Sequence, residues 1–143
     1  MVTVELITGG ITPADISYVV IAARKKEGWL FVKHRRRGGW EMPAGHPGPG
    51  EDTVEAAVRE LTEETGAISF IMEPVSYYCV DTGNGRQYGR LFLAEVDQMG
   101  KHTDTDEIEE VRIFRRLPKN LSLQDVMSFL YRVARQHGKG LRV

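Results

Sequence analysis

The chain has 143 residues, which suits one domain with an adequate core and leaves little room for a second, so we expect a single domain over residues 1–143. Hydrophobic residues make up 41% and charged residues 27%, and the formal net charge is −1, a balance that argues against docking along a nucleic-acid backbone and against a disordered chain. A small anionic substrate stays compatible with it, because local charge and a bound cation matter more than the total charge.

The N-terminal segment does not have the pattern of a signal peptide. Residues 1–10 lack a basic stretch followed by an apolar one. The longest apolar stretch, around residues 19–23, is too short to span a bilayer. We therefore expect a cytoplasmic protein with no membrane partner.

The first half of the chain alternates apolar runs with glycine-containing segments. Residues 16–23 are rich in β-branched side chains and residues 29–33 form a second apolar run, so we expect two strands. The turn Lys26, Glu27 and Gly28 suggests that they form a hairpin. The basic segment 34–40 is expected to be a loop, followed by a short strand over 40–44 that Pro43 stops. The glycine- and proline-rich segment 45–50 must be a shaped loop, because it cannot be helical.

The clearest predicted helix covers residues 53–65. Asp52 is its expected N-cap, with Glu55 completing a capping box, and Gly66 is its expected stop. Four apolar residues at helical spacing are expected to face the core: Val54, Ala57, Val58 and Leu61.

The second half of the chain predicts three strands and a helix. Strands are expected over 75–80 and 88–96, on either side of a turn, and over 109–114. The single cysteine, Cys79, excludes an internal disulfide, and its place in a strand predicts a buried thiol. An amphipathic helix is expected over 123–136, with Ser122 as N-cap and Gly138 as stop. Its apolar stripe is expected to be core: Leu123, Val126, Met127, Leu130 and Val133. Mixed strands with one central and one terminal helix predict an α+β domain whose helices sandwich the sheet.

Three carboxylates lie close together on the central helix. Glu60, Glu63 and Glu64 have the spacing i, i+3, i+4 and are expected to face away from the core contacts of the helix. Like charges so close repel one another unless a cation joins them, and a hard divalent cation with oxygen ligands fits best. Arg59 is spaced to brace Glu51 and Glu63. The alternative is a solvated acidic helix face.

The same residues resemble a known signature. Gly45, Glu51, the triplet Arg59-Glu60-Leu61, the pair Glu63-Glu64 and Gly66 match the spacing of the Nudix box of the MutT/Nudix hydrolases. The segment 39–44 also resembles the strand that commonly leads into this box. Two positions depart from the family pattern: Gly48, where an acidic residue is common, and Ala67, where a bulkier aliphatic residue is usual.

The resemblance implies a fold and a reaction. It implies an α/β/α sandwich with a mixed sheet, a box helix and a C-terminal helix. It also implies that the protein uses Mg²⁺ or Mn²⁺ to hydrolyse a nucleoside diphosphate that is linked to another group. Glu60, Glu63 and Glu64 would be metal ligands, or one of them the general base, and Arg59 and Glu51 a bracing pair. A backbone carbonyl of Ala44 or Gly45 would complete the coordination. An acid from a later loop can also be the base in this family, and Glu107 is the candidate, its alternative being a solvated acidic turn.

Substrate residues are less clearly marked. Arg35 and Arg37, in the basic loop before the box, can place cations near a polyphosphate, with a solvated loop as the alternative. Trp40 or Tyr88 can stack on a base, although a single aromatic near a strand is more often core. Two subfamily markers, a proline or a tyrosine downstream of the box, are absent near residues 83–84.

Their absence favours a nucleoside triphosphate substrate of the MutT kind, cleaved to a nucleoside monophosphate and pyrophosphate. The alternatives within the family are ADP-ribose or sugar nucleotides and the 5′ end of RNA; other nucleic-acid binding is not expected. From another class, the alternative is a non-catalytic nucleotide-sensing module, which would be expected to lose the box carboxylates. The resemblance is also compatible with a homodimer.

Overall fold

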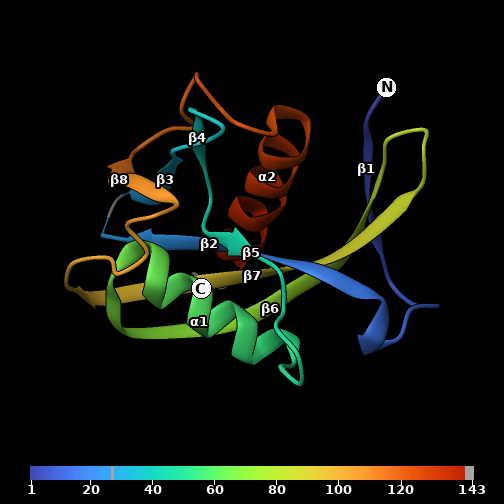
Figure 1. Ribbon diagram of the computed structural model, residues 1–143, viewed down its shortest axis with the longest axis horizontal. Helices are drawn as coiled ribbons and strands as arrows, with labels where there is room; N and C mark the ends of the chain where they lie inside the picture. Colours follow the sequence, from blue (N-terminus) through green and yellow to red (C-terminus); the bar gives the residue numbers. More distant parts are fainter. Residues whose placement is uncertain (27, 141–143) are drawn as a thin grey trace.

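One mixed sheet between two α-helices makes up the fold (Figure 1). A computed structural model describes residues 1–26 and 28–140. In chain order the elements are β1 (Thr3–Ile7), the 3-10 helix η1 (Pro13–Asp15), β2 (Ile16–Lys25), β3 (Gly28–His34), β4 (Trp40–Glu41), β5 (Ala44–Gly45), α1 (Thr53–Thr65), β6 (Ala67–Asp81), β7 (Arg86–Met99), β8 (Ile108–Phe114) and α2 (Gln124–Gly140).

The strands follow the order β1-β6-β7-β2-β3-β4, with β5 added to β2 and β8 added to β3. β2 pairs with β7 in parallel, and the other pairings are antiparallel. The expected hairpin is present, since Arg24 lies opposite Trp29 and Lys25 opposite Gly28. Glu27 of its predicted turn lies outside the described residues.

The two helices cover opposite faces of the sheet. Successive side chains of a strand point to opposite faces, so Val20 and Ala22 of β2 share a core cluster with α2, whereas Val19, Ile21 and Ala23 share one with α1. In Figure 1, α2 lies above and α1 below the strands β2 and β7. The predicted α+β sandwich with a box helix and a C-terminal helix is therefore confirmed.

Helix α1 has the predicted bounds and caps. Asp52 accepts from the backbone N–H of Glu55, and the Glu55 side chain accepts from the N–H of Asp52, which completes the capping box. Gly66 ends the helix in the left-handed conformation, with φ of 79°. The predicted apolar face is wrong for Val54 and Val58, which are 46% and 38% exposed. The buried side of the helix is turned toward β2 and β5, and its members are Ala56, Ala57, Glu60, Leu61, Glu64 and Thr65.

Helix α2 departs from its predicted ends. Ser122 is not the N-cap, because its hydroxyl accepts from the N–H of Gly39, and Leu123 is 45% exposed with a φ of 52°. Gly138 does not stop the helix, which continues to Gly140. A Cβ atom at Gly138 would lie 2.6 Å from the guanidinium of Arg24, so the glycine allows a close approach to the sheet. The rest of the stripe packs on the core as predicted: Val126, Met127, Leu130 and Val133.

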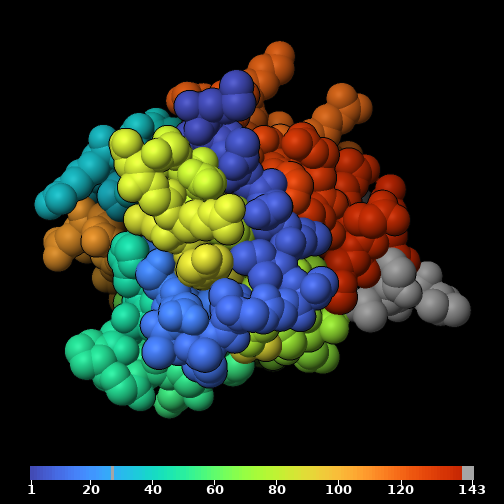
Figure 2. Space-filling model, turned by 90° about the vertical axis from the view of Figure 1, so that its right-hand side faces the viewer, coloured from blue at the N-terminus to red at the C-terminus, as the bar shows by residue number. Residues whose placement is uncertain are grey.

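The strand predictions differ from the structure mainly in the lengths of the strands, and they omit one strand. The expected strand over 40–44 is two short strands, β4 and β5, separated at Met42 and Pro43. β6 and β7 extend well beyond the predicted 75–80 and 88–96. The N-terminal strand β1 was not predicted; Figure 2 shows it, in blue, beside the hairpin tip of β6 and β7. The thiol of Cys79 is buried, as expected. Over the described part of the chain, no helix has the length and apolar character to cross a membrane.

Candidate active site

Strand β5 brings two backbone positions against the inner side of α1. β5 pairs with β2 through Ala44 and Gly45. The N–H of Ala44 donates to the carboxylate of Glu64 over 3.1 Å. At Gly45 the approach is closer, since a Cβ atom there would lie 2.3 Å from the carboxyl carbon of Glu60. The lack of a side chain at Gly45 is what lets this carboxylate lie over the backbone.

Glu60 and Glu64 are buried, which corrects the prediction of an acidic arc facing away from the core contacts of the helix. Glu60 is 8% and Glu64 4% exposed, whereas the side chain of Glu63 is 40% exposed. The prediction was wrong because β5 and the loop between β7 and β8 cover this side of α1, and periodicity along one helix does not report such a cover. The three carboxylates divide into a buried pair and one at the surface.

The Arg59 guanidinium braces the acids of the box. It donates to both oxygens of Glu51, from Nε at 2.8 Å and from Nη2 at 2.9 Å, so the predicted pair is formed. Its Nη1 donates to Glu60 at 2.8 Å and to Glu63 at 3.4 Å. Arg59 and the backbone N–H of Gly48 stabilise the charged form of Glu51 and lower its pKa to about 2. A two-point contact fixes the orientation of a carboxylate, so Arg59 ties the loop to the helix.

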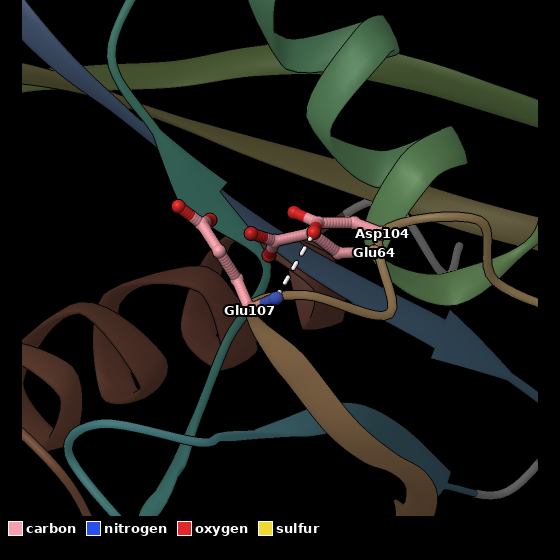
Figure 3. Close-up of side chains that lie close together, drawn as sticks. All are labelled: Glu64, Asp104 and Glu107. Atoms are coloured by element: carbon pink, nitrogen blue, oxygen red, sulfur yellow. Dashed lines mark hydrogen bonds between the residues drawn. The ribbon is translucent and has the colours of Figure 1, made fainter.

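A second acidic element meets α1 at Glu64. Figure 3 shows the side chains of Asp104 and Glu107, from the loop between β7 and β8, lying beside that of Glu64. One ligand oxygen from each residue lies within 4.8 Å of the others. The N–H of Glu107 donates to Asp104 over 3.2 Å, which shapes the loop. Sequence reasoning singled out Glu107 but missed Asp104; the acidic run over 104–107 was the available signal.

Backbone contacts hold this loop in place. The N–H of Asp104 donates to the carbonyl of Glu63 over 3.0 Å. On the other side, the backbone N–H of Arg35 donates to the carbonyl of Glu107, and its Nε donates to the carbonyl of Thr105, each over 2.8 Å. The structure therefore places Arg35, predicted to bind substrate, where it orders the loop that carries Glu107.

The surroundings of the two buried carboxyl groups, Glu60 and Glu64, disfavour their charged forms when no cation is bound. Burial raises the pKa of Glu64 to about 9, and the neighbouring carboxylate of Glu60 adds to the rise. Burial also raises the pKa of Glu60, against the opposing effect of Arg59. Such shifts mean that a cation placed among these groups would be strongly favoured. The side-chain ligand atoms of Glu64, Asp104 and Glu107 are all carboxylate oxygens, a set that suits a hard divalent cation.

Two adjoining cavities open at the site. The first, of about 380 Å³, has a charged lining that includes Arg36, Arg59, Glu60, Glu64 and Glu107. The second, of about 470 Å³, has a largely apolar lining that includes Val2, Tyr78, Val80, Tyr88 and Val126. Three side chains line both cavities: Tyr18, Arg37 and His46. A charged cavity beside an apolar one suits an amphipathic ligand with a polyanionic end.

The remaining predicted substrate residues lie in different places. Tyr88 lines the apolar cavity. Arg37 lines both cavities, and its guanidinium makes a two-point contact of 2.8 and 2.9 Å with the buried carboxylate of Glu41. Trp40 is 8% exposed and packs edge to face on Phe114 at 4.9 Å, so it belongs to the core.

Tyr18 and His46 are the residues at the boundary of the cavities that sequence reasoning missed. Tyr18 lies in a strand that was expected to be wholly core, and burial raises the pKa of its hydroxyl above the usual range. His46 follows Gly45 in a segment predicted only as a shaped loop. No pattern within one sequence distinguishes either residue from its neighbours.

The sequence of the chain is similar to a protein-family model and to named proteins of two bacteria. A family model described as the NUDIX domain matches residues 13–135. A Bacillus subtilis protein provisionally named an 8-oxo-dGTP diphosphatase, YtkD, is 33% identical over 102 residues, covering 71% of this chain and 64% of that protein. An RNA pyrophosphohydrolase of Erythrobacter litoralis is 31% identical over 117 residues, covering 69% and 70%. The match thus spans about two thirds of each relative's length.

Among solved structures, the Bacillus subtilis pyrophosphohydrolase BsRppH, in a mutant form, superimposes with a TM-score of 0.79 at 23% identity. The superposition covers 96% of this chain and 91% of that one. At this level of identity the likeness concerns the fold.

Proposed function

The chain belongs to the Nudix family, and from this premise we propose that it is a divalent-metal-dependent hydrolase that cleaves a diphosphate linkage in a nucleoside diphosphate linked to another group. The observation that carries the proposal is the meeting of Glu64 from the box helix with Asp104 and Glu107 from a distant loop. Without a cation, burial and the neighbouring carboxylates disfavour the charged form of Glu64, and a bound cation would reverse that effect.

The proposed metal ligands are Glu60, Glu63 and Glu64, with a backbone carbonyl of Ala44 or Gly45. Glu64 and Glu60 are already fixed, the first by the N–H of Ala44 and the second by Arg59. When bound, Mg²⁺ or Mn²⁺ would neutralise charge on the phosphate oxygens and favour attack by water. Asp104 adds a further carboxylate to the cluster.

We assign Glu107 as the general base. Its carboxylate is exposed in the charged cavity, whereas Glu64 is buried and already accepts from Ala44. In the reaction, a water oxygen forms a bond to phosphorus and gives a proton to Glu107. The bond from phosphorus to the bridging oxygen breaks, and the leaving group takes the bridging oxygen and its electron pair; when water attacks the α-phosphorus of a nucleoside triphosphate, this leaving group is pyrophosphate.

The substrate that the site supports best is a nucleoside triphosphate, which would give a nucleoside monophosphate and pyrophosphate. The charged cavity suits a polyphosphate, and the apolar cavity, with Tyr78 and Tyr88, suits a nucleoside. The name of the YtkD relative refers to an oxidised deoxyguanosine triphosphate. We therefore place oxidised and ordinary deoxynucleoside triphosphates first among substrates.

The second candidate is the 5′ end of RNA, favoured by the name of the Erythrobacter relative and by the exposed Arg36 in the lining of the charged cavity. ADP-ribose and sugar nucleotides share the same diphosphate chemistry and complete the set within the family. Against a non-catalytic sensing module stands the complete set of box carboxylates, braced by Arg59.

The test is product release with Mg²⁺ from a panel of substrates: nucleoside triphosphates (including oxidised ones), ADP-ribose, sugar nucleotides and 5′-triphosphorylated RNA. Glu107→Gln should lower kcat by about 100-fold or more, since it removes the base and keeps the shape. Glu109→Gln is the matched control, because Glu109 lies two residues away and forms a surface ion pair with Lys33 at 3.7 Å. Equal turnover in the two variants would contradict the assignment of Glu107, and no turnover of any substrate would contradict the proposed function.

A further inference from the structure

His46 is held firmly at the boundary between the two cavities. Its backbone carbonyl accepts from Nη2 of Arg59 at 3.1 Å, and its Nδ1 lies 2.7 Å from the carbonyl oxygen of Ser17. Its ring packs edge to face on Tyr18, with 4.9 Å between ring centres and an interplanar angle of 65°. Two contacts from β2 therefore hold the imidazole and one from α1 holds the backbone of His46, while the rest of the ring is exposed to the cavities.

The contact with Ser17 decides which ring nitrogen carries the proton. A carbonyl oxygen only accepts, so Nδ1 of His46 must be the donor. In the neutral ring Nε2 is then an acceptor, on the side of the imidazole away from Ser17. Within residues 1–26 and 28–140, His46 makes no other side-chain hydrogen bond. Nε2 therefore offers a single, oriented acceptor at the boundary.

An acceptor at this place selects its partner by chemistry. A ring nitrogen that accepts a hydrogen bond needs a partner that donates one, and deprotonated phosphate oxygens only accept. If the polyphosphate occupies the charged cavity and the nucleoside the apolar one, the sugar crosses the boundary where His46 lies. A sugar hydroxyl is a donor, and the 3′-hydroxyl is the one common to ribonucleotides and deoxyribonucleotides.

We propose that Nε2 of His46 accepts a hydrogen bond from the 3′-hydroxyl of the bound nucleotide, so that His46 is a specificity-determining residue for the sugar. This inference rests on the proposed function. Tyr18 packs against the imidazole, and the carbonyl of Ser17 holds the proton on Nδ1, which leaves Nε2 as the acceptor. A nucleotide without a 3′-hydroxyl would leave this acceptor without its partner and would be a poorer substrate.

The experiment measures kcat/KM for a 2′-deoxynucleoside triphosphate and for its 2′,3′-dideoxy counterpart. The wild-type protein should prefer the first by about three- to tenfold, the range of one neutral hydrogen bond. In His46→Phe, which keeps the ring contact with Tyr18, the ratio should fall to about one, while His46→Gln should restore part of it by placing a polar atom near the position of Nε2. A purely structural role would lower both rates equally and leave the ratio unchanged.

A ratio of one in the wild-type protein, or an unchanged ratio in His46→Phe, would overturn the inference while the hydrolase assignment stands. If His46→Phe does not fold, His46→Ala, which also lacks the acceptor, takes its place: an unchanged ratio in that variant would overturn the inference, and a ratio near one would support it. Failure of the wild-type protein to hydrolyse any nucleoside triphosphate would instead overturn the proposed function, and the inference with it.

Discussion

Replacing the buried carboxyl group of Glu64 by the neutral amide of glutamine should make the metal-free protein more stable at alkaline pH. Glu64 is 4% exposed, and its pKa is raised from 4.5 to about 9 in the folded protein. Between these values the native state holds a proton that the unfolded state has lost. The contribution of the Glu64 carboxyl group to the free energy of unfolding is therefore fully present below about pH 4.5 and is lost as the pH rises toward 9.

The size of the effect follows from the same shift. One pH unit in this window corresponds to about 1.4 kcal/mol, so three units, from pH 5 to pH 8, correspond to about 4 kcal/mol. For a chain of this length 1 kcal/mol moves Tm by about 3 °C, which gives about 12 °C. Glu64→Gln keeps an oxygen that can accept from the N–H of Ala44 and has no charge to lose. Wild type and variant should melt at similar temperatures at pH 5 and diverge by pH 8.

The assay is thermal unfolding with a chelator at several pH values, followed by circular dichroism. Glu63→Gln is the matched control on the same helix, because the Glu63 side chain is 40% exposed, and its melting temperature should track the wild type. Added Mg²⁺ should raise the Tm of the wild type at pH 8 far more than that of Glu64→Gln. Parallel curves for Glu64→Gln and wild type from pH 5 to pH 8 would refute the reasoning.

Gly45→Ala should lower turnover by about 100-fold, because its Cβ would lie 2.3 Å from the Glu60 carboxyl group and must displace it. Gly48→Ala, where the nearest atom is 3.6 Å away, should keep near-normal rates, and similar rates in both variants would contradict this account. Gly66→Ala should destabilise the fold by about 2 kcal/mol or more in urea unfolding, since it has a φ of 79° and its Cβ would lie 2.4 Å from the carbonyl oxygen of Gly100. A urea midpoint for Gly66→Ala equal to that of the wild type would exclude that strain. Removing divalent cations with a chelator should abolish hydrolysis, and Mg²⁺ or Mn²⁺ should restore it; activity that persists in chelator would count against a metal-dependent reaction.

The sequence by itself determined the local features. The capping box from Asp52 to Glu55 and the stop at Gly66 predicted the bounds of α1, because caps depend on residues three or four positions apart. Glu51 lies in the loop directly before α1 and Arg59 lies in α1, so their pairing was predictable from their spacing. The order of the strands, with one central and one terminal helix, predicted a sheet between two helices.

Only the tertiary structure decided which residues from distant segments meet. Asp104 joins Glu64 across 40 positions of sequence because the loop after β7 folds back onto the end of α1. The burial of Glu64 follows from the cover that β5 and this loop provide. His46 and Tyr18 come together because β5 pairs with β2. Periodicity reports the face of an element but not what covers that face, and the physical chemistry of this site depends on the cover.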